Sequence, residues 1–172
     1  MITDKQKKFT LIEILAAVAI LAILAGITTG IIGYVRAKTN EARTLATIEI
    51  IKVALEQYKE KYGYYLPISK GNYVKFRTDA VTDVTKATKD NFNQFVDYNS
   101  FIKQGTAVGN AYEIHDGYGK DSYIWYCYPG KVNKGSYDLG SLGADKKSGD
   151  GGAATPDDET FGAGDDITNC KQ

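Results

Sequence analysis

Residues 9–35 read FTLIEILAAVAILAILAGITTGIIGYV and form one apolar segment whose only charged side chain is that of Glu13. As an α-helix rising about 1.5 Å per residue, the uncharged part from Ile14 to Val35 would cross the roughly 30 Å hydrocarbon core of a bilayer. This segment therefore predicts a membrane-spanning helix close to the N-terminus.

A short basic stretch precedes this segment, with Lys5, Lys7 and Lys8 against one acid, Asp4. Positive charge next to a spanning helix tends to stay in the cytoplasm, so the rest of the chain is expected on the other side. The alternative is an ordinary secretory signal peptide cut near Ala22 to Gly26. Two features count against it: Glu13 interrupts the apolar run, and helical periodicity continues far beyond such a cut.

Glu13 is a candidate functional residue because of where its charge lies. A carboxylate at the edge of hydrocarbon costs about 2–3 kcal/mol on insertion scales, so a cationic partner is expected. Cleavage after Lys8 would create one, the new amino group of Phe9, four residues before Glu13. If the amine of one chain meets the carboxylate of a neighbour, the charge pair sets the axial register of the two helices.

Phe9 to Glu13, followed by the apolar run that starts at Ile14, resembles the class III signal of type IV pilins and type II secretion pseudopilins. The resemblance implies that a prepilin peptidase cuts between Lys8 and Phe9 and methylates the new terminus, and that Glu13 guides assembly. Lys8 stands where the family usually has glycine. The implied partners are further copies of the chain in a homopolymeric filament, an inner-membrane assembly platform and membrane lipid.

That resemblance also implies a location. The chain would be a single-pass inner-membrane protein before assembly, with its head outside the cytoplasm, and part of a periplasmic or cell-surface filament afterwards. The expected organisation is a leader at residues 1–8, a transmembrane and assembly helix at 9–35, the amphipathic half of the same helix at 36–62, and a globular head at 63–172.

An amphipathic stripe continues the helix beyond the membrane segment. Apolar residues recur at steps of three or four while the other faces are charged. The stripe consists of Leu45, Ile48, Ile51, Leu55, Tyr58 and Tyr62. One helix from Phe9 to Tyr62, about 80 Å long, is therefore expected.

Gly26, Gly30 and Gly33 lie in the apolar half of this helix. Each glycine costs about 1 kcal/mol relative to alanine, so the helix is expected to bend or melt here. A second, compatible interpretation is that small residues let helices pack closely in the bilayer.

The head is predicted to be α+β. Gly63 ends the helix and Pro67 follows it. Residues 122–128 are rich in aromatic and β-branched side chains and precede a Pro-Gly turn, which predicts a strand with a hairpin partner at 137–139. Such a small antiparallel sheet would pack on the amphipathic half of the helix.

Residues 71–117 alternate short apolar and polar pieces. They are interpreted as a variable connecting loop with one short helix at 90–103.

Residues 116–123, 129–130 and 137–145 resemble the C-terminal region of type II secretion major pseudopilins. In that family the loop after a Leu-Gly-Ala-Asp motif binds calcium through aspartates and backbone carbonyls. The resemblance implies a calcium site formed by Leu142, Asp145, Asp165 and Asp166. Calcium takes about six to eight oxygen ligands and tolerates irregular loops.

Asp150, Asp157 and Asp158 are competing ligands in the same acidic region. On composition alone, a solvated, flexible acidic loop is the alternative interpretation.

Cys127 and Cys170 are the only cysteines. In an exported chain a single pair is more naturally a disulfide than a metal site. Such a bond would fasten the tail to the sheet and contribute about 3–4 kcal/mol.

Catalysis is not expected from this sequence. Lysine plus arginine equals aspartate plus glutamate at 21 each, so no net charge attracts nucleic acid. The single histidine, His115, lies beside Asp116 without an evident nucleophile. The predicted function is therefore a structural subunit of a type IV filament, with a membrane-tethered binding module as the alternative. Within the filament class, the acidic C-terminal motif favours a type II secretion pseudopilus, and the cysteine pair favours a surface pilus.

Overall fold

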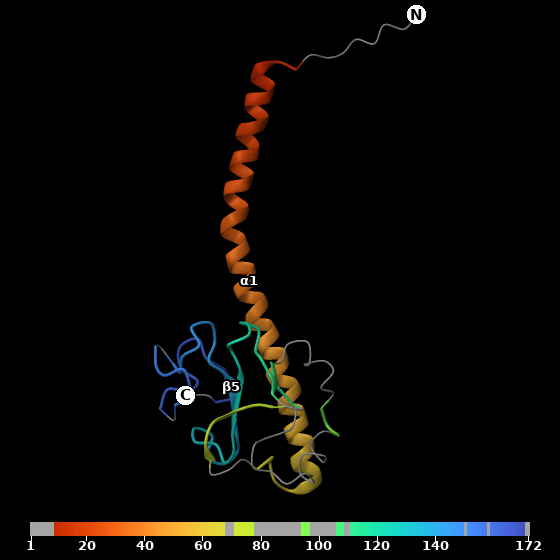
Figure 1. The fold of residues 1–172 in the computed structure, drawn as a ribbon, viewed down its shortest axis with the longest axis vertical. Coiled ribbons are helices and arrows are strands. Elements are labelled where there is room, and N and C mark those ends of the chain that lie inside the picture. Colours follow the sequence, from red (N-terminus) through yellow and green to blue (C-terminus); the bar gives the residue numbers. More distant parts are fainter. Residues whose placement is uncertain are drawn as a thin grey trace, which may run out of the picture. The chain divides into compact units, whose positions relative to one another are not determined.

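The computed structural model describes residues 9–67, 71–77, 94–96, 106–108, 111–149, 151–157 and 159–170. Contacts divide the chain into two compact units, residues 1–38 and 39–172. One helix and six strands are defined (Figure 1): α1 (Leu11–Tyr62), β1 (Val74–Lys75), β2 (Thr106–Val108), β3 (Ala111–Glu113), β4 (Ile124–Cys127), β5 (Asp138–Ser141) and β6 (Ile167–Thr168).

Helix α1 has 52 residues and matches the expected length closely. It ends where the sequence predicts, because Gly63 adopts a left-handed φ of 82° and donates its N–H to the Lys59 carbonyl at 2.7 Å. The helix is uninterrupted from Gly26 to Gly33, so the predicted melting is not present in the single chain. Helix propagation is cooperative, and the helical residues on both sides hold these glycines in helical geometry.

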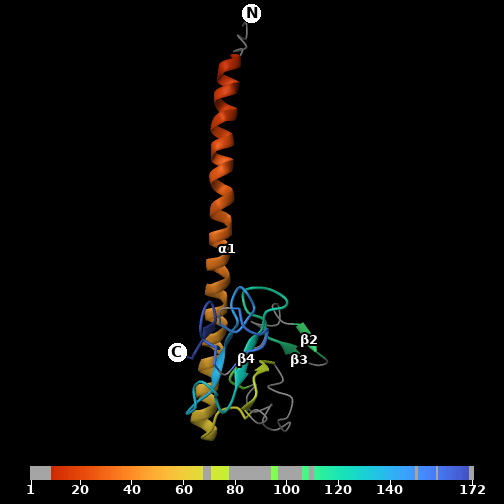
Figure 2. The same cartoon turned by 90° about the vertical axis from the view of Figure 1, so that its left-hand side faces the viewer.

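The core of the second unit forms between α1 and the sheet. From the predicted stripe, Ile51, Leu55 and Tyr58 are fully buried against Ile124 and Leu139. Figure 2 shows β4 alongside the C-terminal part of α1. The fold class is therefore the predicted one, a long N-terminal helix packed on a small antiparallel sheet in a pilin-like α+β arrangement.

One residue of the predicted stripe lies elsewhere. Leu45 is half exposed instead of buried, and Ile50 and Val53, which are outside the stripe, are exposed as well.

The main sheet has the strand order β1-β4-β5-β6, with every neighbouring pair antiparallel. The predicted strand and its hairpin partner are confirmed as β4 and β5, which pair Trp125 with Gly140 and Cys127 with Asp138. Gly140 is required here, because a Cβ atom at this position would lie 2.5 Å from the Thr168 side chain on β6. Close pairing of β5 with β6 therefore excludes a larger residue.

The interpretation of residues 71–117 as a loop with one short helix is wrong for the part that is described. Strand β1 adds an edge to the main sheet, and β2 pairs with β3 in a separate two-stranded sheet. Strands of two or three residues are defined by their partners, so the local sequence carries little signal for them. Of the predicted helix at 90–103, only residues 94–96 are described, and they are not helical.

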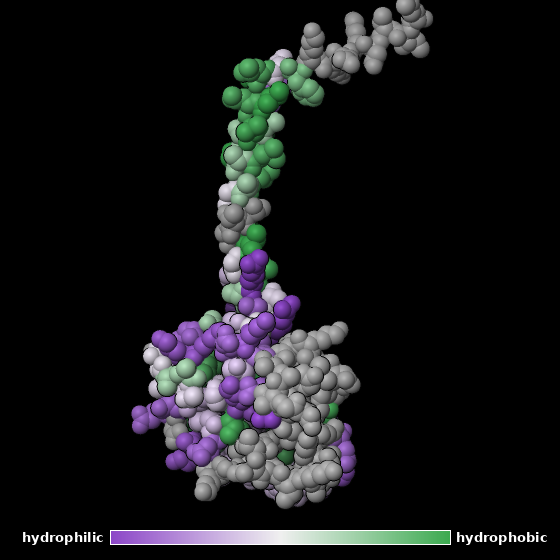
Figure 3. All heavy atoms as spheres, viewed as in Figure 1, coloured by the Kyte–Doolittle hydropathy of each residue, from purple (hydrophilic) through white to green (hydrophobic). Residues whose placement is uncertain are grey.

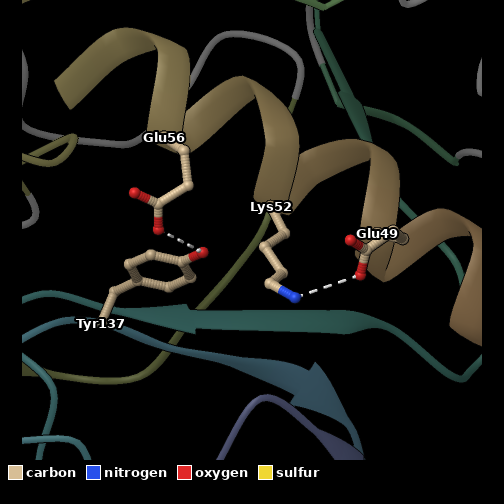
Figure 4. A network of polar contacts seen from close by, with 4 residues as sticks. All are labelled: Glu49, Lys52, Glu56 and Tyr137. Atoms are coloured by element: carbon tan, nitrogen blue, oxygen red, sulfur yellow. Dashed lines mark hydrogen bonds and ion pairs between the residues drawn. The ribbon is translucent and has the colours of Figure 1, made fainter. Parts of the chain in front are cut away.

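Polar contacts also join α1 to the head (Figure 4). Tyr137 donates its hydroxyl to Glu56 at 3.5 Å, and Tyr65 donates to the same carboxylate at 2.9 Å. Burial raises the pKa of Tyr137, and the nearby Glu56 charge raises it further, so this hydroxyl stays protonated as a donor. The neighbouring ion pair of Lys52 with Glu49, at 3.3 Å, is exposed and therefore contributes little to stability.

Candidate functional site

The N-terminal end of α1 is organised around Thr10 and Glu13. The Thr10 N–H and hydroxyl donate to Glu13 Oε2 at 2.8 and 2.9 Å, and the Glu13 N–H donates to the Thr10 hydroxyl at 3.4 Å. This reciprocal pattern is a capping box, in which the two side chains satisfy backbone donors that the first helical turn leaves open. The sequence carries the signal for it, Thr-x-x-Glu, so Thr10 is a site residue that the sequence analysis missed.

The capping box gives Glu13 a role within its own chain. Both bonds that it accepts end on Oε2, and among the described residues Oε1 accepts none. The carboxylate is exposed, and its charge has no cationic partner within the described part of the chain. Glu13 can therefore cap its own helix and still present a negative charge to another molecule.

The side chains that follow form an apolar surface around α1. Figure 3 shows hydrophobic residues gathered on this part of the helix. Phe9 is 79% exposed and Leu21 is 64% exposed, and no residue from 11 to 27 is buried. This helix is long and apolar enough to cross a membrane. Such a surface is stable only in lipid or against other apolar helices.

Gly26 and Gly33 are not needed for packing within the chain. A Cβ atom at either position would have no atom within 4 Å. Small residues in a membrane helix allow a second helix to approach closely. The predicted role of these glycines in helix–helix packing therefore concerns contacts outside the single chain.

His115 and Asp116 belong to a turn that docks on α1. Both are buried, and Asp116 accepts hydrogen bonds from the Tyr118 N–H at 2.7 Å and from the hydroxyls of Ser122, at 2.5 Å, and Ser141. The next residue, Gly117, donates its N–H to the Thr44 hydroxyl on α1 at 2.9 Å. These contacts occupy the Asp116 carboxylate with structural donors.

The acidic C-terminal loop is held by aspartates that accept backbone N–H groups. Asp165 Oδ2 accepts from Ala144 at 2.6 Å and Asp145 at 3.1 Å, and Asp166 Oδ2 accepts from Gly149 and Gly162 at 3.0 Å each. These bonds join residues 144, 145, 149 and 162 to the Asp165–Asp166 pair.

The predicted calcium ligands fit a metal site only in part. Burial raises the pKa of Asp166, and the charges of Asp165 and Asp145 raise it further. Asp166 Oδ1 is buried without a hydrogen-bond partner among the described residues. However, no three His, Cys, Asp or Glu side chains converge on one point within the described residues. Asp150 and Asp158 lie outside those residues, and Leu142 is buried beside the loop.

The predicted disulfide between Cys127 and Cys170 is not formed. Both are buried thiols without a bond between them. Cys170 donates to Asp138 Oδ1 at 3.2 Å, and Cys127 donates to the Pro129 carbonyl at 3.3 Å. Burial, followed by the Asp138 charge, raises the pKa of Cys170 to about 12, so this thiol stays protonated near neutral pH.

Counting the thiols that an alkylating reagent can reach tests whether both cysteines are reduced and buried. We expect an alkylating reagent to label two thiols per chain in denaturant and close to none in the native protein, because both side chains are buried. Mass spectrometry of the intact chain without reductant gives the number directly. Two labels missing after denaturation, together with a mass lower by two hydrogens, would instead demonstrate a disulfide.

One family model matches the chain, described as the prokaryotic N-terminal methylation motif, and it covers residues 5–29. No curated protein and no solved structure matches. The matched segment contains Phe9, Thr10 and Glu13, whose geometry is described above, and the apolar surface that follows. This motif is a class III signal typical of type IV pilins and pseudopilins, and it implies processing by a prepilin peptidase and anchoring in the inner membrane before assembly.

Proposed function

We propose that this protein is a structural subunit of a type IV filament, processed after Lys8 and polymerised through α1. The observation that carries the proposal is the apolar surface of residues 11–27, which no part of the described chain covers, with a single exposed carboxylate, Glu13, at its start. A tether needs an apolar helix but has no use for a charge at this position, because burying it costs energy.

The proposed contact joins two chains through opposite charges. Cleavage between Lys8 and Phe9 places a cationic amine at Phe9, and Glu13 of a neighbouring subunit accepts it. The capping box keeps the carboxylate at a fixed place on the helix, with Oε1 left to accept the amine. Two opposite charges attract strongly in an apolar environment, and a single charge buried there without a partner is costly. A wrong axial register would leave the amine and the carboxylate unpaired, so it is disfavoured.

Two substitutions separate the charge of Glu13 from its capping role. Glu13→Gln keeps an oxygen that can accept from Thr10 but removes the charge. Thr10→Val removes the hydroxyl contacts of the cap, leaves the N–H of residue 10 to donate to Glu13, and keeps the charge. We expect both variants to enter the membrane. Sheared filaments seen by electron microscopy should be abundant for the native chain, close to native for Thr10→Val, and reduced at least about tenfold for Glu13→Gln.

Mass spectrometry of the N-terminus completes this experiment. A methylated Phe9 terminus in the filaments supports the proposal. Filaments from Glu13→Gln at native abundance contradict the role of the charge. Absence of filaments from every variant, with Met1 retained or a cut near residues 22–26, favours a membrane-tethered binding module.

We further propose that the acidic loop takes up calcium, which would favour a type II secretion pseudopilus over a surface pilus. The support is the buried, unpartnered Oδ1 of Asp166 and the raised pKa of that carboxyl beside two other acids. A divalent cation would bind the unpartnered oxygen and reduce the repulsion between the acids. Asp145, Asp165 and the Leu142 carbonyl would be its further oxygen ligands.

Metal removal tests this second proposal. Calcium should raise the melting temperature of the full chain in detergent, and a chelator should reverse the rise. Asp166→Asn should abolish the response, whereas Glu60→Gln, an exposed change on α1, should leave it intact. An equal melting temperature with calcium and with chelator would reject the calcium site and leave the filament proposal untouched.

A further inference from the structure

A hollow of about 300 Å³ lies on the head beside strands β1 and β4, and no function described above uses it. Its walls come from four places in the sequence: Lys75 on β1, Trp125 on β4, Leu142 after β5, and Ala154 in the C-terminal loop. The hollow therefore exists only in the folded head. Its volume is at the lower end for ligand sites, which suits a molecule of amino-acid size.

Part of the wall is already committed to contacts within the chain. The Lys75 ammonium lies 3.6 Å from the centre of the Tyr123 ring and also pairs with Glu113 at 3.2 Å. His115 lies against the Tyr123 ring as well, with 4.8 Å between the ring centres. Tyr123 and Lys75 are thus fixed in place and form a rigid wall, so a ligand must be recognised by other groups.

Two other residues that line the hollow carry unused charges of opposite sign. Neither the Asp121 carboxylate nor the Lys146 ammonium makes a hydrogen bond or ion pair with another described residue. The same lining includes three apolar side chains, Trp125, Leu142 and Ala154, and two hydroxyl side chains, Ser122 and Thr155. One hollow therefore offers an acid, a base and an apolar surface together.

The backbone of Lys146 supports a role in binding. Its φ is 60°, and it is the only residue other than glycine with a left-handed φ in the part of the chain that is described. A lysine in this conformation is strained, and glycine would fit without cost. Strained residues often occur where a side chain contacts a ligand. A lysine at this place is easier to explain if its ammonium has a use.

We propose that this hollow binds a small zwitterion, an α-amino acid with an apolar side chain. The ligand ammonium lies on Asp121, the ligand carboxylate lies on Lys146, and the apolar side chain contacts Trp125 and Leu142. The ligand ammonium and carboxylate each neutralise a charge that the described part of the chain leaves unpaired, and the apolar side chain covers the surface of Trp125 and Leu142. The proposal does not depend on filament assembly.

The protein contains its own reporter, because Trp125 is its only tryptophan. Leucine is added to the full chain in detergent while tryptophan fluorescence is recorded. A saturable change is expected. N-acetyl-leucine lacks the ammonium and leucinamide lacks the carboxylate, so each should bind at least about tenfold more weakly. No saturable change at millimolar leucine, or equal binding of all three compounds, would overturn the proposal.

Variants locate the two contacts. Lys146→Gly removes the ammonium and also relieves the backbone strain, so loss of folding cannot explain loss of binding. It should weaken leucine binding about tenfold and leave leucinamide binding unchanged. Asp121→Asn should weaken leucine and spare N-acetyl-leucine. The matched control is Lys147→Gly, next in sequence but outside the lining, which should bind leucine as the native chain does. Unchanged leucine binding by Lys146→Gly would place the ligand elsewhere.

Discussion

Replacing Gly117 by alanine is expected to lower the free energy of unfolding of the head by about 3 kcal/mol, at the upper end of what overpacking costs. A Cβ atom at this position would lie 2.1 Å from the backbone carbonyl oxygen of Asn40 on α1. A backbone atom within a helix cannot move aside as a flexible side chain would. The turn must therefore withdraw, and its hydrogen bond from Gly117 to Thr44 is lost with it.

Urea unfolding of the full chain in detergent, followed by Trp125 fluorescence, measures this effect. The matched control is Gly135→Ala, because a Cβ atom there meets nothing within 4 Å. Native stability of Gly117→Ala would show that the turn does not rest on α1. If the loss is confirmed, Thr44→Val should show a smaller loss of about 1–2 kcal/mol, since it removes only the two hydrogen bonds of the Thr44 hydroxyl, one accepted from Gly117 and one donated to the Asn40 carbonyl.

Replacing Asp138 by leucine is expected to destabilise the head even more strongly. This carboxylate is fully buried and accepts hydrogen bonds from the N–H groups of Lys131, Val132 and Asn133 at 2.7–3.0 Å, and from the Tyr73 hydroxyl at 2.9 Å. Removing the acceptor leaves several donors without a partner, and each buried orphan costs about 1–3 kcal/mol. We expect a loss of at least about 4 kcal/mol.

The same carboxylate predicts sensitivity to acid. Burial would raise the pKa of Asp138, but the hydrogen bonds from Val132, Asn133 and Tyr73 outweigh it and hold the pKa below its usual value. A carboxyl with a lower pKa in the folded state contributes stability above the unfolded pKa of about 4. That contribution is lost as the pH falls through the folded pKa.

Melting temperatures between neutral pH and pH 3 check this prediction. The native chain should lose stability below about pH 4, and Asp138→Asn, already less stable at neutral pH, should lose less on acidification. Glu60→Gln serves as the control for a general charge effect. An identical acid response in the native chain and in Asp138→Asn would contradict the assignment.

The strength of local signals explains which parts of this protein are predictable. The sequence predicts a helix from Phe9 to Tyr62, and α1 spans Leu11–Tyr62, because helical periodicity and the Gly63 stop are each read from residues that are near neighbours along the chain. Strand β4 and its partner β5 are predictable for the same reason, since only ten residues, 128–137, separate them in the sequence. The motif around Glu13 is equally local, so the methylation segment is recognisable from consecutive residues alone.

The other features of the fold depend on contacts between residues that are far apart in the sequence. Strands β1 and β6 have two residues each and exist only because β4 and β5 lie beside them. The state of Cys170 depends on Asp138, 32 residues earlier in the sequence, and the need for glycine at 117 depends on a helix residue 77 positions away.

The amino-acid sequence by itself therefore determined the membrane-length helix, the position of its charge and the α+β class, because each follows from the chemistry of consecutive residues. Only the tertiary structure placed the Asp116 turn on α1, gave Asp138 its hydrogen-bond donors, and brought Asp121 and Lys146 to one hollow. These features join segments distant in sequence, and the spacing of residues along the chain does not report which surfaces will meet once the core between α1 and the sheet has formed.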